Sequence, residues 1–226
     1  MGTIIRAERA SREFRTGSMT VQALCEATLA IERGTLTLLQ GPSGSGKTTL
    51  INLLGALDSP TSGAVFFDDV PLHELSDSQR DDIRRLKMGF VFQSVGLISL
   101  MSAFENVDFG LRLAGYDARG RAQRAEECLA FVGLRPRMHH RPSELSGGDQ
   151  QRVAIARAMA HKPVVIFADE PTAELDTAMG LQVLRGFKAL VTDERVTVVM
   201  SSHDPAITEL ADRVIALEDG RVTSGG

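Results

Sequence analysis

Residues 35–48 read TLTLLQGPSGSGKT, and this stretch decides the fold. Its first six residues form an apolar and β-branched run that predicts a buried strand. Its last eight, from Gly41 to Thr48, match the pattern G-x-x-x-x-G-K-[ST] in full. Apolar residues at helical spacing then continue to Leu57. A strand, a glycine-rich loop and a helix in this order predict a phosphate site, because loop amides and a helix N-terminus both attract anions.

The loop residues suit a nucleoside triphosphate and its metal ion. Glycines let backbone N–H groups turn inward around a phosphate. Lys47 places one positive charge near the β- and γ-phosphates, and Thr48 offers a hydroxyl to Mg²⁺. The flanking strand and helix disfavour the alternative, a glycine-rich loop that binds nothing. The predicted nucleotide-binding residues are Gly41, Pro42, Ser43, Gly44, Ser45, Gly46, Lys47, Thr48 and Thr49.

A second motif is the run VVIFADE at residues 164–170. An apolar strand that ends in two carboxylates is costly to bury unless the carboxylates face a site. In P-loop enzymes the first such carboxylate, here Asp169, holds Mg²⁺. Glu170 is then placed to orient or deprotonate an attacking water. A solvated strand end is the alternative for one carboxylate taken alone.

A third motif, LSGGDQQR, occupies residues 145–152. Ser146, Gly147 and Gly148 stand at an expected helix start, which makes a second anion-binding nest. Taken alone, the same residues also suit an ordinary helix cap. Two phosphate nests beside one lysine loop are unusual for a simple kinase.

Composition narrows the class of protein. The chain has 226 residues, with 25 Lys and Arg against 29 Asp and Glu, and its net charge of −4 argues against a nucleic-acid partner. Two cysteines make neither a disulfide framework nor a zinc site, which suits a reducing cytoplasm. Charges at Arg6, Glu8 and Arg9 interrupt any secretion signal. The longest uncharged run, residues 88–104, is too short and too polar to span a bilayer, so we expect any membrane role to come through a partner.

Strand and helix patterns alternate along the chain, which predicts an α/β fold with a mainly parallel sheet. The first thirty-odd residues read as β-structure, and residues 219–220 suggest a turn in a closing hairpin. The middle of the chain reads as helical. We expect one domain, 1–226, in which an α/β core (1–94 and 144–226) carries an inserted helical lobe (about 95–143). Expected helices are 77–87, 119–132, 148–160 and 177–191, and expected strands are 64–67, 89–93, 164–168 and 196–201.

The lysine loop, Gln93, the LSGG motif, the carboxylate strand and His203 follow one another along the chain. With its motifs in this order, the chain resembles the ATP-binding subunits of ABC transporters. The resemblance covers nearly the whole chain. It implies a P-loop NTPase core with a mainly parallel sheet, an N-terminal antiparallel β subdomain and an inserted α-helical lobe. It also implies a Mg²⁺-dependent ATPase whose cofactors are ATP and Mg²⁺.

The resemblance implies a homodimer or pseudo-dimer that pairs head to tail, with each ATP between two copies. Ser146, Gly147 and Gly148 would then contact the γ-phosphate of the partner's nucleotide. Asp176 would lie at the dimer interface, although it also suits a cap for the helix that starts near Thr177.

Three further roles are implied by the resemblance. Gln93 would reach Mg²⁺ and the attacking water, which makes it both a metal ligand and a catalytic residue. His203 would touch the γ-phosphate and support Glu170, and Phe14 would stack on adenine. Taken alone, Gln93 could end a strand, His203 could be a surface histidine and Phe14 could belong to the core.

Several segments are similar to the lipoprotein-release and macrolide-efflux branch of this family, namely residues 14–17, 21–24, 53–63 and 105–107. That branch implies integral membrane permease subunits, here encoded separately, and a peripheral place on the cytoplasmic face of the membrane. The uncharged segment 95–104 either packs internally or forms part of a groove for a partner's helix.

The chain departs from the family pattern at Asp149, Glu174 and Ser202. We expect the first two to add negative charge near the dimer interface and so to weaken pairing without nucleotide. The departures leave every predicted catalytic group in place.

Two other functions compete with a transporter subunit. A soluble ABC ATPase that acts on DNA or ribosomes usually has tandem ATPase units, long coiled coils or zinc modules, and the sequence shows none of these. A P-loop kinase is opposed by the LSGG motif and by the lack of an acceptor-pocket signature.

Overall fold

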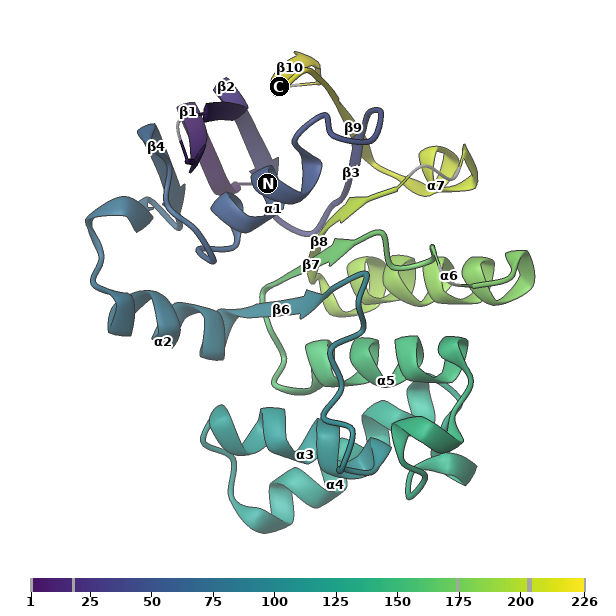
Figure 1. Cartoon of the computed structure of the whole chain (residues 1–226). Coiled ribbons are helices and arrows are strands. Elements are labelled where there is room, and N and C mark those ends of the chain that lie inside the picture. Colours follow the sequence, from purple (N-terminus) through teal and green to yellow (C-terminus); the bar gives the residue numbers. More distant parts are fainter. Residues whose placement is uncertain (1, 18, 174, 203–204, 226) are drawn as a thin grey trace.

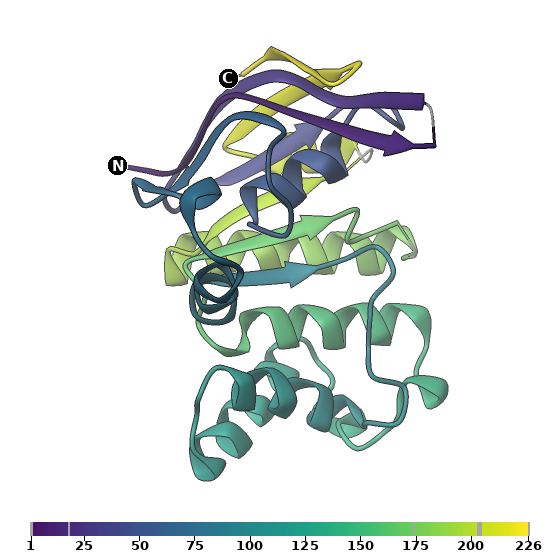
Figure 2. The ribbon, with the colours of Figure 1, turned by 60° about the vertical axis from the view of Figure 1, so that its left-hand side comes forward.

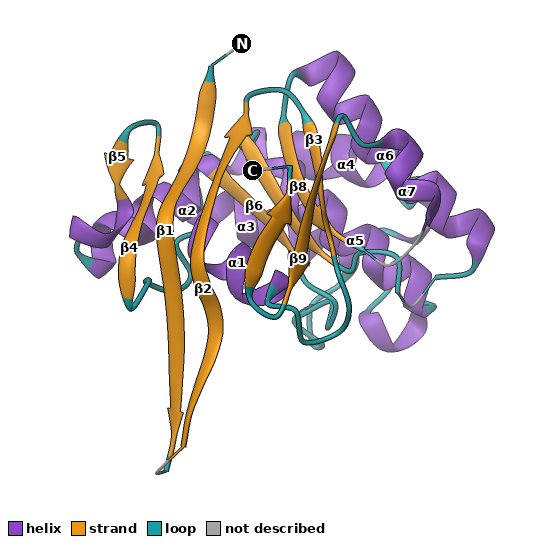
Figure 3. Cartoon of the chain, turned by 90° about the horizontal axis from the view of Figure 1, so that it is seen from above, coloured by secondary structure: helices purple, strands orange, loops and turns teal. Residues whose placement is uncertain are grey.

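The computed structural model describes residues 2–17, 19–173, 175–202 and 205–225, and these residues form two sheets flanked by helices. The N-terminal antiparallel sheet has the strand order β2-β1-β4-β5. Its strands are β1 (Thr3–Thr16), β2 (Met19–Glu32), β4 (Ser62–Phe67) and β5 (Val70–Pro71). The hairpin of β1 and β2 extends well beyond the rest of this sheet (Figure 3).

The second sheet has the order β10-β9-β3-β8-β7-β6, and only the β9–β10 pair is antiparallel. Because β8 lies between β3 and β7, segments far apart in sequence end side by side at one edge. Its strands are β3 (Leu36–Gln40), β6 (Met88–Val91), β7 (Val165–Asp169), β8 (Thr197–Ser201), β9 (Arg213–Glu218) and β10 (Arg221–Ser224).

Helices pack against both faces of the parallel sheet. Helix α1 lies between the two sheets, while α3, α4 and α5 gather at the opposite end of the molecule (Figures 1 and 2). The helices are α1 (Lys47–Leu54), α2 (Asp77–Lys87), α3 (Ala103–Leu113), α4 (Ala118–Phe131), α5 (Gly147–Ala160), α6 (Thr177–Glu194) and α7 (Pro205–Leu210).

Successive side chains of β7 enter two different cores, as the alternation of a strand requires. Val165 and Phe167 pack with α1 and the antiparallel sheet. Ile166 and Ala168 pack with α5, α6 and the helices of the middle segment. This two-sided burial explains why the strand is an unbroken apolar run until it reaches its carboxylates.

The predicted fold class is confirmed: a mainly parallel sheet, an N-terminal antiparallel sheet and a helical middle segment are all present. Strand β6 ends at Val91, two residues earlier than predicted, so Gln93 follows the strand instead of ending it. In segment 95–104, Val95, Leu97 and Phe104 pack against the core while Leu100 is exposed. Across the described residues, every helix is too short or too polar to cross a bilayer.

Candidate nucleotide site

The phosphate-loop motif connects β3 to α1, as its sequence predicts. The Lys47 ammonium group bends back over this loop and donates hydrogen bonds to the carbonyl oxygens of Gly41, at 2.8 Å, and Pro42, at 3.1 Å. Lys47 is buried, so water screens its charge less and the charge acts more strongly on groups bound in the loop.

Glycine is required at Gly46, the residue that precedes α1. Its φ of 101° lies in the left-handed region. A Cβ at this position would approach the carbonyl oxygen of Ala23 in β2 to 2.6 Å. The loop is therefore held against the antiparallel sheet by close backbone packing that a larger residue would disrupt.

Asp169 is bound by hydroxyls on both carboxylate oxygens. Thr48 Oγ1, from the start of α1, donates to Oδ2 at 2.8 Å. Ser201 Oγ, from the end of β8, donates to Oδ1 at 2.5 Å. The sequence predicts Asp169 and Thr48 as metal ligands but not Ser201, whose only sequence signal is its place at the end of a buried strand.

Glu170 follows β7 directly and has a left-handed backbone, with φ at 48°. Its N–H donates to Ser201 Oγ at 3.0 Å. A positive φ is uncommon outside glycine and is frequent where function constrains the chain. This conformation turns the chain sharply just after Asp169, at the mouth of the cleft.

One cleft of about 350 Å³ collects half of the predicted site residues. It brings together the phosphate loop, the two carboxylates and Gln93, which come from three separate parts of the sequence. Its lining residues are Ala23, Ser43, Gly44, Gly46, Lys47, Thr48, Thr49, Gln93, Asp169, Glu170 and Ala173.

The third motif lies outside this cleft. Ser146 is exposed and caps α5, where its hydroxyl accepts a hydrogen bond from the Asp149 N–H at 3.1 Å. A Cβ on Gly148 would lie 3.3 Å from the Leu175 side chain, so the motif packs beside the loop before α6. Asp176 caps α6 by accepting from the Met179 N–H at 2.9 Å. Within one chain, these residues and the cleft therefore remain separate.

The structure corrects the expectation for Asp149. Its side chain is only 3% exposed, and it forms ion pairs with Arg137 and Arg152. Burial raises the pKa of Asp149, but hydrogen bonds from Ser146, Arg152 and Arg137 together lower it below the ordinary value of 3.8. Its negative charge is therefore neutralised inside the chain instead of standing exposed at the surface.

Phe14 lies on β1, 40% exposed, and does not line the cleft. The Arg12 guanidinium stands 4.7 Å from the centre of its ring and also pairs with Asp58 at 2.8 Å. Phe14 is thus a surface aromatic and not a core residue. His203, with its predicted catalytic role, and Glu174 lie outside the described residues.

The donor set fits a magnesium–nucleotide complex. Mg²⁺ prefers oxygen ligands and is usually held by one or two carboxylates together with substrate phosphates. Thr48 and Asp169 supply a hydroxyl and a carboxylate beside the phosphate loop. Within the described ranges, no group of three or more His, Cys, Asp or Glu side chains could hold a metal alone. Phosphate oxygens of a nucleotide and water would complete the coordination of a metal held here.

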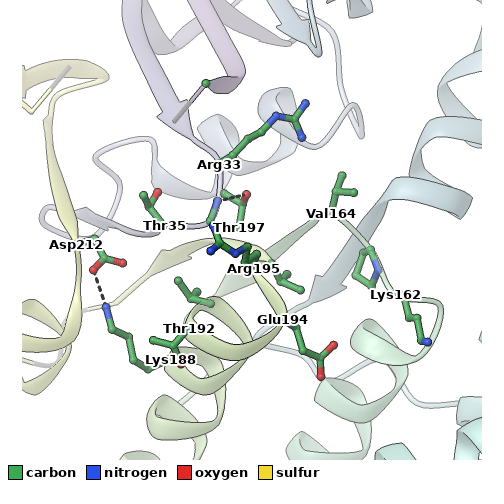
Figure 4. A pocket seen from close by; sticks show the side chains of 15 residues that line it. Arg33, Thr35, Lys162, Val164, Lys188, Thr192, Glu194, Arg195, Thr197 and Asp212 are labelled. Atoms are coloured by element: carbon green, nitrogen blue, oxygen red, sulfur yellow. Dashed lines mark hydrogen bonds and ion pairs between the residues drawn. The ribbon is translucent and has the colours of Figure 1, made fainter.

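A larger cavity of about 900 Å³ opens at the opposite edge of the parallel sheet (Figure 4). Several of its polar groups are held by hydrogen bonds within the chain. Asp212 accepts from Lys188 Nζ at 2.6 Å and from the Leu36 N–H at 2.8 Å, and Thr197 accepts from the Gly34 N–H. In proteins with an open parallel sheet, ligands bind outside the carboxyl ends of the strands, and the smaller cleft lies there. Size is therefore a poor guide to the site in this molecule.

Comparisons with known proteins agree with this geometry. A family model described as ABC transporter matches residues 24–173. An ABC transporter ATP-binding protein of Methanocaldococcus jannaschii, MJ0796, is 40% identical over 97% of this chain and 95% of its own length. The macrolide export ATP-binding/permease protein MacB of Syntrophobacter fumaroxidans is 44% identical over 96% of this chain, which spans 31% of that longer protein.

A solved structure gives the same result. The dimeric post-hydrolysis state of the MJ0796 cassette, bound to ADP and Pi, matches with a TM-score of 0.93 and 39% identity. The match covers 98% of this chain and 97% of the other. With the phosphate loop, the carboxylate strand and the LSGG helix all in place, the chain belongs to the ABC transporter family as an ATP-binding protein.

Proposed function

We propose that this chain binds ATP as its Mg²⁺ complex and hydrolyses it to power a membrane permease. The observation that carries the proposal is the single cleft that joins Lys47, Thr48, Gln93, Asp169 and Glu170. Phosphoryl transfer to water needs mainly positioning and charge neutralisation, and this set of side chains supplies both.

Each side chain of the cleft has a distinct task. Lys47 and the loop amides hold the triphosphate. To do so, the Lys47 ammonium group gives up its hydrogen bonds to the two loop carbonyls and donates to phosphate oxygens instead. Thr48 and Asp169 hold the metal, with Gln93 beside them. Glu170 takes a proton from the attacking water as a general base. Bound Mg²⁺ neutralises the negative charge of the phosphates.

We propose that the site is completed by a second copy of the chain. The exposed position of Ser146 supports this, because a nest that faces solvent is free to meet a phosphate held elsewhere. Gly147 and Gly148 belong to the same nest, while Asp176 and His203 would join the contact. Phe14 would stack on adenine. ATP binding would close the dimer and hydrolysis would open it.

The permease partner has a candidate docking surface, which we name the apolar groove. It measures about 450 Å³ and is lined by residues of α2, β6, α3 and α5. Leu57, Phe92 and Leu113 are large apolar side chains that stay exposed along it. An amphipathic helix on the cytoplasmic side of a permease fits such a surface. Its lining residues are Leu57, Asp81, Arg84, Arg85, Met88, Gly89, Phe90, Phe92, Gly110, Leu113, Arg157, Ala158 and His161.

We assign the chain to one nucleotide-binding domain, with an ATPase core (1–94 and 144–226) and a helical lobe (about 95–143). Its place would be the cytoplasmic face of the membrane. The likeness to MacB supports a macrolide-efflux or lipoprotein-release system. The permease would be encoded separately.

The general-base role is tested with Glu170→Gln. Turnover should fall about 10²–10⁴-fold, because the variant cannot accept the proton, while nucleotide binding persists. ATP hydrolysis and the binding of a fluorescent ATP analogue measure the two effects. Glu194→Gln, at the exposed end of α6 and the opposite sheet edge, is the matched control and should behave like the wild type. Wild-type turnover in Glu170→Gln would refute the assignment.

A further inference from the structure

Ser201 carries a fully buried hydroxyl that contacts two residues of the candidate site, Asp169 and Glu170. It ends β8, where the parallel register places it beside Leu39 of β3 and Asp169 of β7. The sheet therefore inserts this serine between the strand that leads into the phosphate loop and the strand that ends in the carboxylates.

The Ser201 hydroxyl makes two hydrogen bonds of opposite sense. It donates to Asp169 Oδ1 at 2.5 Å and accepts from the Glu170 N–H at 3.0 Å. The first bond is charge-assisted, the stronger class of hydrogen bond. Thr48 donates to the other oxygen of Asp169, so hydrogen bonds to both oxygens fix the orientation of this carboxylate.

The second bond acts on the backbone. Glu170 has a left-handed φ of 48°, a conformation that persists only where the surroundings hold it. The Ser201 hydroxyl supplies such a contact at the amide of Glu170 itself. One side chain thus links the orientation of Asp169 to the position of Glu170.

We infer that Ser201 is a positioning residue, which fixes Asp169 for its metal and Glu170 for its water. The inference rests on the proposed function. In metal sites, residues that orient a ligand typically change metal affinity or activity 10–100-fold when they are removed. A serine that only filled the strand end would leave both unchanged.

The experiment compares three variants of the full chain. Ser201→Ala removes the hydroxyl, and Ser201→Thr retains it. Thr37→Val is the matched control, because Thr37 is equally buried in the neighbouring strand β3 and its hydroxyl has no hydrogen-bond partner among the described residues. If Ser201→Ala does not fold, Ser201→Cys keeps the side-chain size with a much weaker donor.

Three measurements separate positioning from packing. The first is calorimetric affinity for a non-hydrolysable ATP analogue with Mg²⁺ and with chelator. The second is the Mg²⁺ concentration that half-activates ATP hydrolysis, together with kcat and KM. The third is hydrogen exchange at the Glu170 amide in nucleotide-free, metal-free protein, which reports the backbone contact without any turnover.

For Ser201→Ala we expect kcat to fall and the half-activating Mg²⁺ concentration to rise, each by about 10-fold or more. Affinity measured with chelator should stay at the wild-type value, and the Glu170 amide should exchange faster. Ser201→Thr and Thr37→Val should both show the wild-type Mg²⁺ dependence.

Unchanged Mg²⁺ dependence and amide exchange in Ser201→Ala would overturn the inference, as would an equal loss in Thr37→Val. Either result would leave the proposed function standing if the wild-type chain hydrolyses ATP. A wild-type chain that neither binds nor hydrolyses the Mg²⁺–nucleotide complex would refute the proposed function and this inference together.

Discussion

At the scale of single residues, a buried carboxylate is neutralised by arginine side chains of the same chain. Asp149 shows this most clearly, because its carboxylate lies among Arg137, Arg152 and Ser146 at the start of α5. Arg152 also donates to the carbonyl oxygen of Val132 at 3.0 Å. The cluster thereby ties the LSGG helix to the end of α4 while the carboxylate caps the helix N-terminus.

Asp149→Asn should destabilise the fold by about 1–3 kcal/mol at neutral pH, since it leaves Arg152 without its buried partner. Because folding lowers the pKa of Asp149 below 3.8, this stabilisation is complete above that value and is lost as the pH falls through the folded pKa. The difference in urea unfolding free energy between variant and wild type should therefore shrink only below about pH 4.

The exposed pair of Asp82 and Arg85 on α2 provides the control for this prediction. Asp82→Asn should cost under about 1 kcal/mol, as exposed ion pairs usually do. Equal losses in the two variants would mean that burial of Asp149 adds nothing to its pairing.

At the scale of elements, helix α5 connects the parts of the site. Its N-terminus carries Ser146, and further along it Arg157 donates to the carbonyl oxygens of Gly96, at 2.7 Å, and Val95, at 3.1 Å. Burial lowers the pKa of the Arg157 guanidinium. These two carbonyls follow closely after Gln93, so α5 holds the loop that carries Gln93 beside the apolar groove.

Arg157→Ala should loosen this loop. The Ile98 N–H, in the same loop, donates a hydrogen bond to Asn106 Oδ1 at 2.8 Å. Hydrogen exchange at this amide should accelerate about tenfold or more, because hydrogen bonds from a charged donor contribute roughly 1.5–3 kcal/mol each. Arg119→Ala, on the exposed side of α4, should leave this exchange unchanged. Wild-type exchange in Arg157→Ala would show that Asn106 holds the segment alone.

At the scale of the whole molecule, the nucleotide cleft and the apolar groove are separate surfaces joined through Gln93 and α5. The cleft lies at the carboxyl edge of the parallel sheet, and the groove lies between the sheet and the helical segment. A partner seated in the groove would contact residues next to Arg157 and so would be sensitive to the state of the cleft.

Leu113→Asp should weaken the association with a permease about tenfold or more, because a charge would replace an apolar side chain in the contact. Leu113 is 54% exposed, so the fold and the basal ATPase activity should persist. The measurement is recovery of a multi-pass membrane protein with the tagged chain from native membranes in mild detergent with ATP.

Phe131→Asp is the matched control, since Phe131 is 48% exposed on α4 and does not line the groove. Equal recovery with both variants would argue against the groove as the docking surface. Recovery of the wild-type chain only from the soluble fraction, with ribosomal or DNA-repair proteins, would favour the soluble ABC ATPase instead.

The sequence by itself determined what depends on neighbours along the chain. The phosphate loop from Gly41 to Thr48 and the pair Asp169–Glu170 are contiguous, so their chemistry can be recognised without a fold. Helix α2 has the predicted bounds, and Ser76 and Gln79 form a capping box within four residues that specifies where it begins. Alternating strands and helices similarly indicated a parallel sheet.

Only the tertiary structure decided which distant groups meet. Thr48 and Ser201 lie 121 and 32 residues from Asp169, yet each hydroxyl binds one oxygen of its carboxylate. The strand order β3-β8-β7 causes this, and no local pattern encodes that order. Likewise, the charge on Asp149 suggested repulsion at an interface until folding brought Arg137 to it. Local spacing specifies the type of each chemical group, whereas sheet order and helix packing specify its partners.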